Sequence, residues 1–505
     1  MSQDDPHAQP TGATGPGGVY RPGGGAGVGA ATPSKPVVQK GKQVVRRPDV
    51  DTLFSINPDG SRNAIHPADV SGRFQRRKHV FFFVLIAIYL VMPWLRVGGH
   101  PALLIDIQSR HFYLFGHTFN AQDFWFAFFF VTGLGFTLFV VAALFGRMWC
   151  GYACPQTVFL EGVFRRIERW IEGPAAARAK LDKAPFAQKA VRRGLKLAVF
   201  AVISAVITHS FLGYFMPVEV LVEAVTSSPS KHPTAFTFML VATGILFVNF
   251  TWFREQLCIV VCPYGRLQGA LYDPDTILVG YDHKRGEPRG PAGKQGSGDC
   301  VDCYRCVAVC PTGIDIRNGT QLECVGCANC IDACDDVMAK LGRPQGLVRY
   351  DSLRGFETGA RRFVRGRVFL YVVLMFAGIG AFAFALTRQR PFEASLARAR
   401  GSAYSLEGER VHNSFELQLI NKRPSARKFT LRASSAPNIE VVIGASELEL
   451  QSLEDRRFVV HAFVPKAEFK AGLRVEVTVT CDEPEGEDLV RVATAPLLGP
   501  TSIRH

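Results

Sequence analysis

The chain has 505 residues, with 58 Lys and Arg against 44 Asp and Glu, so its net charge is +14. Only 20% of the residues are charged and the mean hydropathy is +0.11, whereas about a quarter of the residues in soluble proteins are charged. Because the apolar residues also gather in blocks of membrane-spanning length, the composition excludes a purely soluble protein. The surplus positive charge flanks these blocks, which favours a membrane surface over a nucleic-acid partner.

The first 75 residues show no apolar periodicity. They include the stretch GATGPGGVYRPGGGAGVGAATP, which is rich in Gly, Pro and Ala. Such a composition cannot bury enough apolar surface to offset the entropy lost on ordering, so we expect a disordered tail. The tail lacks the apolar core of a cleaved signal peptide, and we expect the first span to act as the membrane signal.

Five apolar runs follow the tail, and each is almost free of charge. A helix needs about 20 apolar residues to cross the hydrocarbon core of a bilayer. A buried core helix would explain one such run but not five. We therefore predict five transmembrane helices, at roughly 79–95, 124–146, 197–217, 234–253 and 368–387.

Basic residues are distributed unequally around these runs. Residues 161–196 hold ten Lys and Arg, whereas the loops 96–123 and 218–233 hold only Arg96, Arg110 and Lys231. Positive loops stay in the cytoplasm. The N-terminus, the 161–196 loop and the Cys-rich segment before the fifth span are thus expected to be cytoplasmic, and the segment after the fifth span to be periplasmic.

The outer segment, residues 391–505, alternates apolar and polar residues in stretches such as RFVVHAFV and LRVEVTVT. Turn-rich gaps such as DEPEGED separate these stretches. About seven short strands in this length predict an antiparallel sandwich of immunoglobulin-like type. Cys481 lies in one of the strands, and we interpret it as a buried small apolar residue.

Twelve of the 13 cysteines lie in short tracts at metal-ligand spacing, which excludes a disulfide scaffold. The strongest tract, at 300–334, contains the bacterial ferredoxin spacing C-x2-C-x2-C-x3-C twice, and the first copy is followed by Pro. In such repeats the fourth Cys ligates the other cluster. Structural zinc needs only four Cys and fits two triple-Cys runs poorly, and the reducing cytoplasm disfavours disulfides. We expect two 4Fe-4S clusters, one held by Cys300, Cys303, Cys306 and Cys334, the other by Cys324, Cys327, Cys330 and Cys310.

A second signal is a duplicated C-x3-C-P motif, just past the second and the fourth spans. Each copy has a preceding Arg and a following Gln. Cys residues at i and i+4 share one face of a helix, so two such faces could place four sulfurs around a soft ion, above all Cu(I). Ordinary packing cysteines are the alternative, which the repetition disfavours. The candidate residues are Cys150, Cys154, Cys258 and Cys262.

Other candidates are weaker. Met92, Met148 and Met216 could offer thioethers to copper, but packing explains each of them better. His209 lies inside the third span, where an ionisable group suggests function, although a neutral His bonded to a helix carbonyl explains it better. The sequence has no haem-attachment motif, phosphate loop or dinucleotide fingerprint.

At RMWCGYACPQTVFLEGVFRRIERWIEG and across the two ferredoxin motifs, the sequence resembles the CcoG family (also called FixG or RdxA), accessory proteins of cbb3-type cytochrome c oxidase. The resemblance covers essentially residues 75–500. It implies a protein of the bacterial inner membrane that reduces Cu(II) to Cu(I) for the copper centre of the oxidase. It further implies a cytoplasmic electron donor, and copper chaperones and oxidase assembly factors as partners.

The predicted fold is thus a polytopic α-helical membrane protein with a cytoplasmic bacterial-type ferredoxin (α+β) insert and a C-terminal periplasmic immunoglobulin-like β-sandwich. The expected parts are a tail (1–75), a four-span core (76–265), a ferredoxin domain (266–360), a fifth span (361–390) and the sandwich (391–505). A cupric reductase is the leading hypothesis, in which the four membrane cysteines are the catalytic and copper-binding residues. A quinol-linked electron relay and a non-catalytic assembly scaffold are the alternatives.

Overall fold

The computed structural model describes residues 65–500, apart from short gaps at 98–99, 108–110, 120–123, 294, 388–390, 400, 424, 435–437, 453, 471 and 483–487. It also describes two short paired strands, β1 (Val37–Val38) and β2 (Val44–Val45). Most of the predicted tail, residues 1–75, lies outside the described residues.

Five helices in the described part of the chain are long and apolar enough to cross a membrane, as expected from the five apolar runs. Many of their apolar side chains face outward, including Phe83, Phe128 and Phe369, which suits contact with lipid. The helices are α1 (Arg73–Val91), α2 (Phe124–Phe145), α7 (Phe186–Leu212), α9 (Pro233–Val248) and α15 (Gly366–Thr387).

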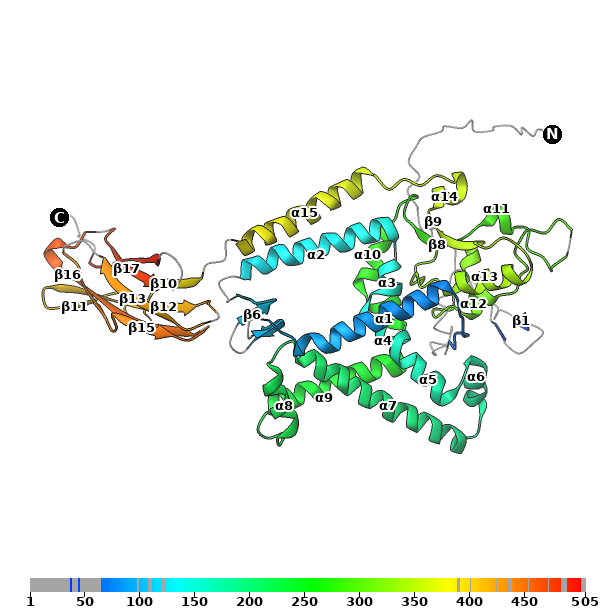
Figure 1. The fold of residues 1–505 in the computed structure, drawn as a ribbon, viewed down its shortest axis with the longest axis horizontal. Helices are drawn as coiled ribbons and strands as arrows, with labels where there is room; N and C mark the ends of the chain where they lie inside the picture. Colours follow the sequence, from blue (N-terminus) through cyan, green and yellow to red (C-terminus); the bar gives the residue numbers. More distant parts are fainter. Residues whose placement is uncertain are drawn as a thin grey trace, which may run out of the picture.

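Close packing of small residues joins the last span to the second. A Cβ atom on Gly378 of α15 would lie 2.8 Å from the backbone nitrogen of Gly133 in α2. Because neither residue has a side chain, the two backbones can approach closely, as is common between helices in membranes. The fifth span therefore rests on the second (Figure 1).

Short elements connect the spans at both ends of the bundle. At one end lie small antiparallel hairpins and α8; at the other lie helices that carry the duplicated Cys motifs and the basic loop. The first group is β3 (Arg96–Val97), β4 (His100–Pro101), β5 (Leu103–Asp106), β6 (His111–Leu114), β7 (His117–Phe119) and α8 (Val218–Thr226). The second group is α3 (Met148–Tyr152), α4 (Pro155–Phe159), α5 (Arg165–Glu172), α6 (Ala175–Lys183) and α10 (Pro263–Leu271).

The Cys-rich unit, which we define as residues 272–360, folds around a two-stranded antiparallel pair with Val279 opposite Tyr350. Short helices follow the strands and the Cys runs. The elements are β8 (Leu278–Tyr281), α11 (His283–Gly286), α12 (Arg305–Ala308), α13 (Asn329–Lys340), β9 (Val348–Asp351) and α14 (Leu353–Thr358).

Helix α13 fixes the Cys-rich unit to the first span. The carboxylate of Asp332 accepts hydrogen bonds from the backbone N–H groups of Phe74 (3.1 Å) and Gln75 (2.8 Å). These N–H groups belong to the first turn of α1 and have no partner within the helix. Lys78 of α1 also donates to the side chain of Asn329. The first span and α13 are thus joined by polar contacts in addition to apolar packing.

The outer segment forms a sandwich of two antiparallel sheets. The described residues contain nine strands rather than about seven, because short strands such as β11 and β15 escape a search for alternating patterns. One sheet has the order β10-β12-β16-β14 with β11 beside β12, and the other has the order β15-β13-β17-β18. The strands are β10 (Phe392–Arg398), β11 (Ser405–Glu407), β12 (Arg410–Asn421), β13 (Arg427–Ser434), β14 (Glu440–Ile443), β15 (Glu447–Leu450), β16 (Asp455–Pro465), β17 (Arg474–Cys481) and β18 (Leu489–Pro496).

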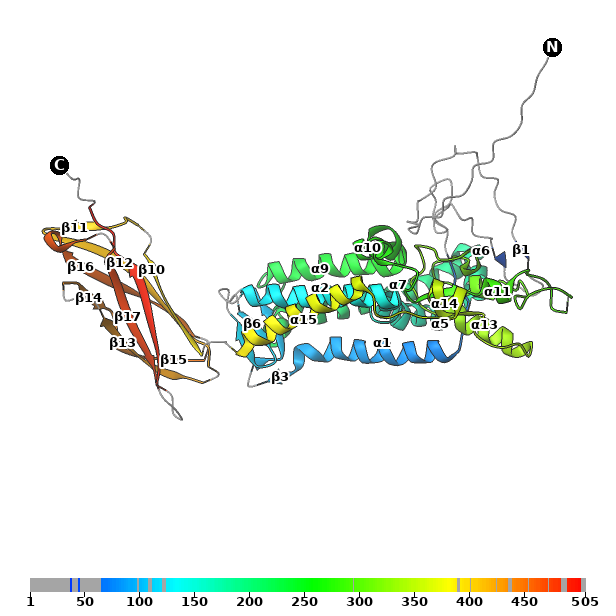
Figure 2. The ribbon, with the colours of Figure 1, turned by 90° about the horizontal axis from the view of Figure 1, so that it is seen from above.

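The core of the sandwich is made by inward-facing apolar residues of both sheets. Phe392, Phe415, Phe429 and Val477 are fully buried there. Cys481 is also fully buried in this core, in agreement with its interpretation as a packing residue. The Cys-rich unit and the sandwich lie at opposite ends of the helix bundle (Figures 1 and 2).

Candidate functional site

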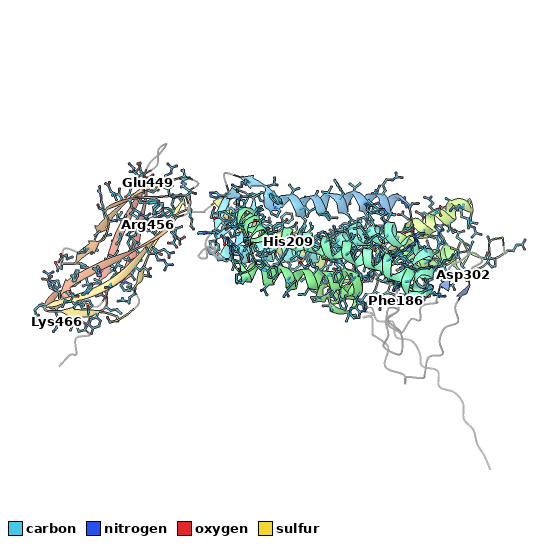
Figure 3. All side chains as sticks on the ribbon, turned by 90° about the horizontal axis from the view of Figure 1, so that it is seen from below. Phe186, His209, Asp302, Glu449, Arg456 and Lys466 are labelled. Atoms are coloured by element: carbon cyan, nitrogen blue, oxygen red, sulfur yellow. The ribbon has the colours of Figure 1, made fainter. Side chains whose placement is uncertain are left out.

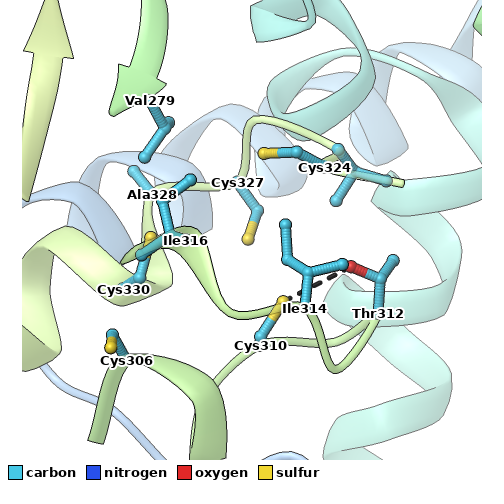
Figure 4. A pocket seen from close by; sticks show the side chains of 11 residues that line it. Val279, Cys306, Cys310, Thr312, Ile314, Ile316, Cys324, Cys327, Ala328 and Cys330 are labelled. Carbon is cyan, nitrogen blue, oxygen red and sulfur yellow. Dashed lines mark hydrogen bonds between the residues drawn. The ribbon is translucent and has the colours of Figure 1, made fainter. Parts of the chain in front are cut away.

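Eight thiols of the Cys-rich unit surround two neighbouring cavities. The first cavity has Tyr281 and Val348 in its wall. The second has Val279, Ile314 and Ile316 in its wall, and Figure 4 shows its thiols. Cys300, Cys303 and Cys334 line only the first cavity, and Cys306 borders both cavities. Four line only the second: Cys310, Cys324, Cys327 and Cys330.

Helix α13 explains how the fourth thiol of a run reaches the other cavity. Cys330 and Cys334 both lie on this helix, four residues apart. Cys330 lines the second cavity and Cys334 lines the first. The structure therefore groups the thiols in the two sets that an exchange of the fourth ligand requires, while cluster ligation by these residues stays a prediction.

The two Cys loops share an unusual backbone. Asp302 and Tyr304 of the first run have positive φ angles, and so do Gly326 and Ala328 at the same places in the second run. Non-Gly residues rarely adopt this left-handed conformation. Such turns curl a chain so that successive N–H groups point into a concavity, a geometry typical of anion and iron–sulfur sites.

The chemistry of the donor set fits iron–sulfur clusters. Burial raises the pKa of Cys310 to about 11 and that of Cys324 and Cys334 to about 12, so these thiols are neutral at pH 7 until a metal displaces their protons. In residues 65–500, outside the gaps, no three His, Cys, Asp or Glu side chains are close enough to hold one metal ion. Four thiols spread around a cavity suit a multi-iron cluster better than the single zinc ion considered from the sequence.

The duplicated C-x3-C-P motifs do not form the continuous helical face that their spacing predicts. Cys150 lies in α3, but Cys154 has an extended backbone (φ −62°, ψ 127°) and precedes α4. Cys258 lies in a π-helical turn, and Cys262 (φ −64°, ψ 112°) precedes α10. The prediction of a shared helix face was wrong because a proline disfavours the helical conformation of the residue before it.

The four membrane-proximal thiols nevertheless lie close together. Cys150 interacts electrostatically with Cys154 and Cys262, and Cys258 interacts with all three others. Burial raises the pKa of Cys150 and of Cys258 to about 12. As placed, no three of the four satisfy the geometry of a single-ion site. They form a half-buried sulfur cluster at the end of the bundle that carries the Cys-rich unit.

Glutamine side chains interlock the two duplicated segments. Gln156, which follows the first motif, donates to the carbonyl of Arg254 (3.0 Å) and exchanges two hydrogen bonds with the amide of Asn249. Gln268, which follows the second motif, accepts a hydrogen bond from the thiol of Cys150 (3.6 Å). Each segment thus reaches the helix end of the other, which accounts for the Gln found in both copies.

The loop between Cys324 and Cys327 rests directly on α3. A Cβ atom on Gly151 would lie 2.7 Å from the carbonyl oxygen of Gly326 and 3.0 Å from Cα of Cys327. Arg147 strengthens this contact by donating to the carbonyl of Cys324 (3.3 Å) and to the carbonyl of Gly265. The helix that carries Cys150 and the loop that lines the second cavity are therefore in backbone contact.

A buried group of charges, which sequence reasoning missed, lies beside the second motif. Glu168 pairs with both Nη atoms of Arg254 (2.7 and 3.2 Å) and with Arg178 (3.1 Å) and Lys196 (3.4 Å). Only 3% of the Glu168 side chain is exposed. Glu168 thereby joins α5, α6, α7 and the end of the fourth span. The arginine repeated before each motif was the only signal in the sequence.

The weaker candidates are accounted for by packing and local bonding. His209 Nδ1 lies 2.6 Å from the carbonyl oxygen of Ala205, one helical turn earlier. Met216 packs against Leu212 and Met239 at the end of the bundle away from the thiols. Met148 lines a small cavity beside Cys324. These contacts give no support to a copper role for Met216 or to a functional role for His209.

Comparison with protein-family models gives three matches. Residues 253–353 match a 4Fe-4S dicluster domain, and residues 382–495 match the immunoglobulin-like fold at the C-terminus of FixG. Residues 125–174 match a 4Fe-4S binding domain. This last region contains only Cys150 and Cys154, fewer than the four thiols of a cubane, so we do not infer a third cluster.

Curated relatives match most of the chain. It is 39% identical to protein RdxA of Cereibacter sphaeroides over 76% of this chain and 85% of that protein. It is 35% identical to the nitrogen fixation protein FixG of Rhizobium meliloti, over 79% and 85% of the two chains. It is 36% identical to protein RdxB of Cereibacter sphaeroides, over 75% and 83%.

Proposed function

This chain belongs to the FixG/RdxA family and is an iron–sulfur electron-transfer protein of the membrane; from this premise we propose that it is a cupric reductase. It would convert Cu(II) to Cu(I) for the copper centre of a cbb3-type cytochrome c oxidase, the role that the family resemblance implies. Copper is the substrate in this proposal, and the copper chaperones and oxidase assembly factors that receive it are proposed partners.

The basic loops support a proposed orientation in the bacterial inner membrane. Arg166 and Arg193 lie in the basic loop at the end of the bundle that carries the Cys-rich unit, and Arg361 directly follows that unit in the sequence. This end would face the cytoplasm. With five spans, the sandwich at the other end would face the periplasm. A cytoplasmic reductant would then supply electrons to the Cys-rich unit.

The contact between Gly151 and Gly326 is the observation that carries the proposal. It brings the backbone of Cys327 against the helix of Cys150, with no side chain between. When bound at the eight thiols, two 4Fe-4S clusters supply one-electron transfer. The loop of Cys324 and Cys327, which lines the second cavity, is the part of the unit in contact with α3. Apolar walls around both cavities would limit access of water.

The four membrane-proximal thiols would bind and retain the copper. Each reduction consumes one electron per Cu(II) and yields one Cu(I). Soft sulfur ligands favour Cu(I) over Cu(II), so thiolate ligation would favour the reduction. Because Cys150 and Cys258 are neutral at pH 7, copper binding would release their protons. Modest motions of the extended residues Cys154 and Cys262 would complete the ligand set.

The test uses the purified full-length protein, reduced anaerobically and mixed with Cu(II). We expect one Cu(I) for each electron stored, measured with a Cu(I)-specific chelator. The double substitution Cys258→Ser and Cys262→Ser should abolish this conversion while iron content stays unchanged. Cys481→Ser, in the sandwich core, is the matched control. A double variant that reduces copper at the rate of the control would overturn the assignment of the thiols.

A further inference from the structure

Two histidines lie side by side on the sandwich, far from the thiols. His412 in β12 and His461 in β16 project from adjacent strands, and His412 Nε2 lies 2.8 Å from His461 Nδ1. Their neighbours along the strands, Val411, Val460 and Ala462, are fully buried in the core. Because side chains alternate across a strand, both imidazoles project from the outer face of the sheet.

The neighbours hold the ring of His412 in one orientation. Phe463 lies opposite His412 in the ladder and stacks on it, with ring centroids 4.6 Å apart and planes inclined by 11°. On the other side, His412 Nδ1 lies 2.8 Å from a carboxylate oxygen of Glu407 and 3.1 Å from the hydroxyl of Ser405. Only 14% of the His412 side chain is exposed. The ring is therefore fixed before any ligand arrives.

The hydrogen bonds determine which nitrogen of His412 is free to bind a ligand. Since the carboxylate of Glu407 can only accept, His412 Nδ1 carries the proton and Nε2 of the neutral ring has a lone pair. A carboxylate on the far nitrogen is the arrangement that orients metal-ligating histidines. His412 Nε2 lies beside His461 Nδ1, which presents a second lone pair when the proton of that ring is on Nε2.

The separation of the two nitrogens suits a shared metal ion. Nitrogens that each lie about 2.0 Å from one ion are about 3 Å apart when the angle at the ion is near 90°. The observed separation of 2.8 Å is close to this value. The hydroxyl oxygen of Ser414 lies 3.2 Å from His412 Nε2 and 3.3 Å from His461 Nδ1. It can therefore bind the ion or a water molecule on it.

We propose that His412 Nε2 and His461 Nδ1 form a binding site for one divalent first-row transition ion, with Cu(II) bound most tightly. Imidazole pairs follow the order of affinity in which Cu(II) exceeds Ni(II), Co(II) and Zn(II). Ser414 and water complete the coordination, and Glu407 positions His412.

The site is independent of the proposed reductase activity. Strand β16 runs outward from Arg456, and Lys466 lies just past its end, at the part of the sandwich far from the bundle (Figure 3). His461 lies between them, on the opposite side of the bundle from the Cys-rich unit. No described residue connects this site to the thiols by a direct contact. The proposal therefore concerns capture of an ion on the outer domain and not its reduction.

The test is electron paramagnetic resonance of the full-length protein, with oxidised clusters, after addition of one equivalent of Cu(II). Oxidised clusters hold no electrons for its reduction, so bound copper stays Cu(II) and keeps its signal. Couplings to nitrogen then distinguish copper at the two histidines from copper at thiolates. We expect a tetragonal Cu(II) spectrum with couplings to two nitrogens. A wild-type spectrum without nitrogen couplings would overturn the proposal whatever the variants do.

Variants assign the signal to the two histidines. His412→Gln or His461→Gln should weaken Cu(II) binding by at least about 100-fold and leave at most one nitrogen coupling, while Glu407→Gln should weaken it roughly 10-fold. His283→Gln, in the Cys-rich unit, is the matched control. Should Cu(II) bind both histidine variants as tightly as the control, the proposal fails. Copper reduction should be equal in all four variants, which separates this result from a failure of the proposed function.

Discussion

The two C-x3-C-P segments share a preceding Arg, the motif itself and a following Gln, and they differ in what their arginines contact. Arg147, before the first motif, donates to backbone carbonyls of Cys324 and Gly265. Arg254, before the second, is buried against the carboxylate of Glu168 and has a positive φ of 49°. The first copy thus supports the Cys-rich unit through Arg147, and we call it the seat. The second copy is fixed within the bundle through Arg254, and we call it the anchor.

This difference shows that a motif can be duplicated with its thiols retained while the flanking residues of the two copies make different structural contacts. The thiols of both copies still lie together, and the glutamines of both copies still reach across. The first copy therefore controls how closely the Cys-rich unit approaches the sulfur cluster. The second copy controls whether the segment around it stays folded. Substitutions in the two copies should consequently affect different measurements.

The largest effect is expected at the anchor. Glu168→Gln leaves Arg254 and Arg178 without their buried counter-charge, while Lys196 keeps its pair with Glu172. Removal of one partner from a buried ion group costs about 3–5 kcal/mol. We expect a marked loss of thermal stability of the detergent-purified protein. Glu219→Gln, an exposed residue paired with Arg96, is the control and should cost less than about 1 kcal/mol. Equal melting temperatures for the two variants would contradict the anchoring role.

The next largest effect is expected at the seat. Gly151→Ala would place a methyl group 2.7 Å from the carbonyl oxygen of Gly326, so the Cys-rich loop must move away from α3. Electron transfer slows as the separation of donor and acceptor grows. We expect copper reduction to slow several-fold while iron content is unchanged. Gly135→Ala in α2, where no atom lies within 4 Å, should leave the rate unaltered, and equal rates would refute the seat.

Exchange of arginine for lysine should separate the two copies. Arg254→Lys loses a two-point bond to a buried carboxylate, for which we expect a cost of about 2 kcal/mol. Arg147→Lys loses neutral carbonyl partners, for which we expect about 1 kcal/mol. Thermal unfolding of the two variants would give the ratio of these two losses of stability. A larger loss of stability for Arg147→Lys than for Arg254→Lys would reverse the comparison.

The smallest effect is expected from mild acid. Burial pushes the pKa of Glu168 upward, but the positive charges of Arg254, Lys196 and Arg178 outweigh it and hold the pKa far below the ordinary value of 4.5. Stability from this group is therefore present at neutral pH and declines as the pH falls below 4.5, by less than about 1 kcal/mol at pH 4. Melting curves recorded from pH 7 to pH 4 would show this loss of stability. The same loss in the Glu168→Gln variant would exclude Glu168 as its cause.

The spans and the grouping of the cluster thiols could be predicted because each depends on local pattern. Apolar runs of about 20 residues have one stable solution in lipid. The ferredoxin spacing places Cys334 one helical turn beyond Cys330, about 6 Å further along the axis of α13, so that the two thiols reach neighbouring cavities. In both cases the chain close by in sequence supplies the whole constraint, and no distant partner needs to be known.

Other features could not be predicted, or were predicted wrongly, for physical reasons. The helical face of Cys150 and Cys154 was wrong because Pro155 was treated as a flanking residue rather than as a constraint on Cys154. The ion group around Glu168 joins residues up to 86 positions apart, and nothing in the local sequence marks such pairs. The contact of Gly151 with Gly326 is a long-range approach of the same kind.

The bond between Asp332 and the start of α1 has a consequence for the order of biogenesis. The first span is the earliest to emerge from the ribosome, yet the carboxylate that completes its opening turn lies 258 and 257 residues beyond the N–H groups that it binds. Until translation has passed that aspartate, those groups must stay hydrated at the membrane surface. Helix α1 can therefore complete its first turn only after the segment that contains Asp332 and the cluster cysteines has been synthesised.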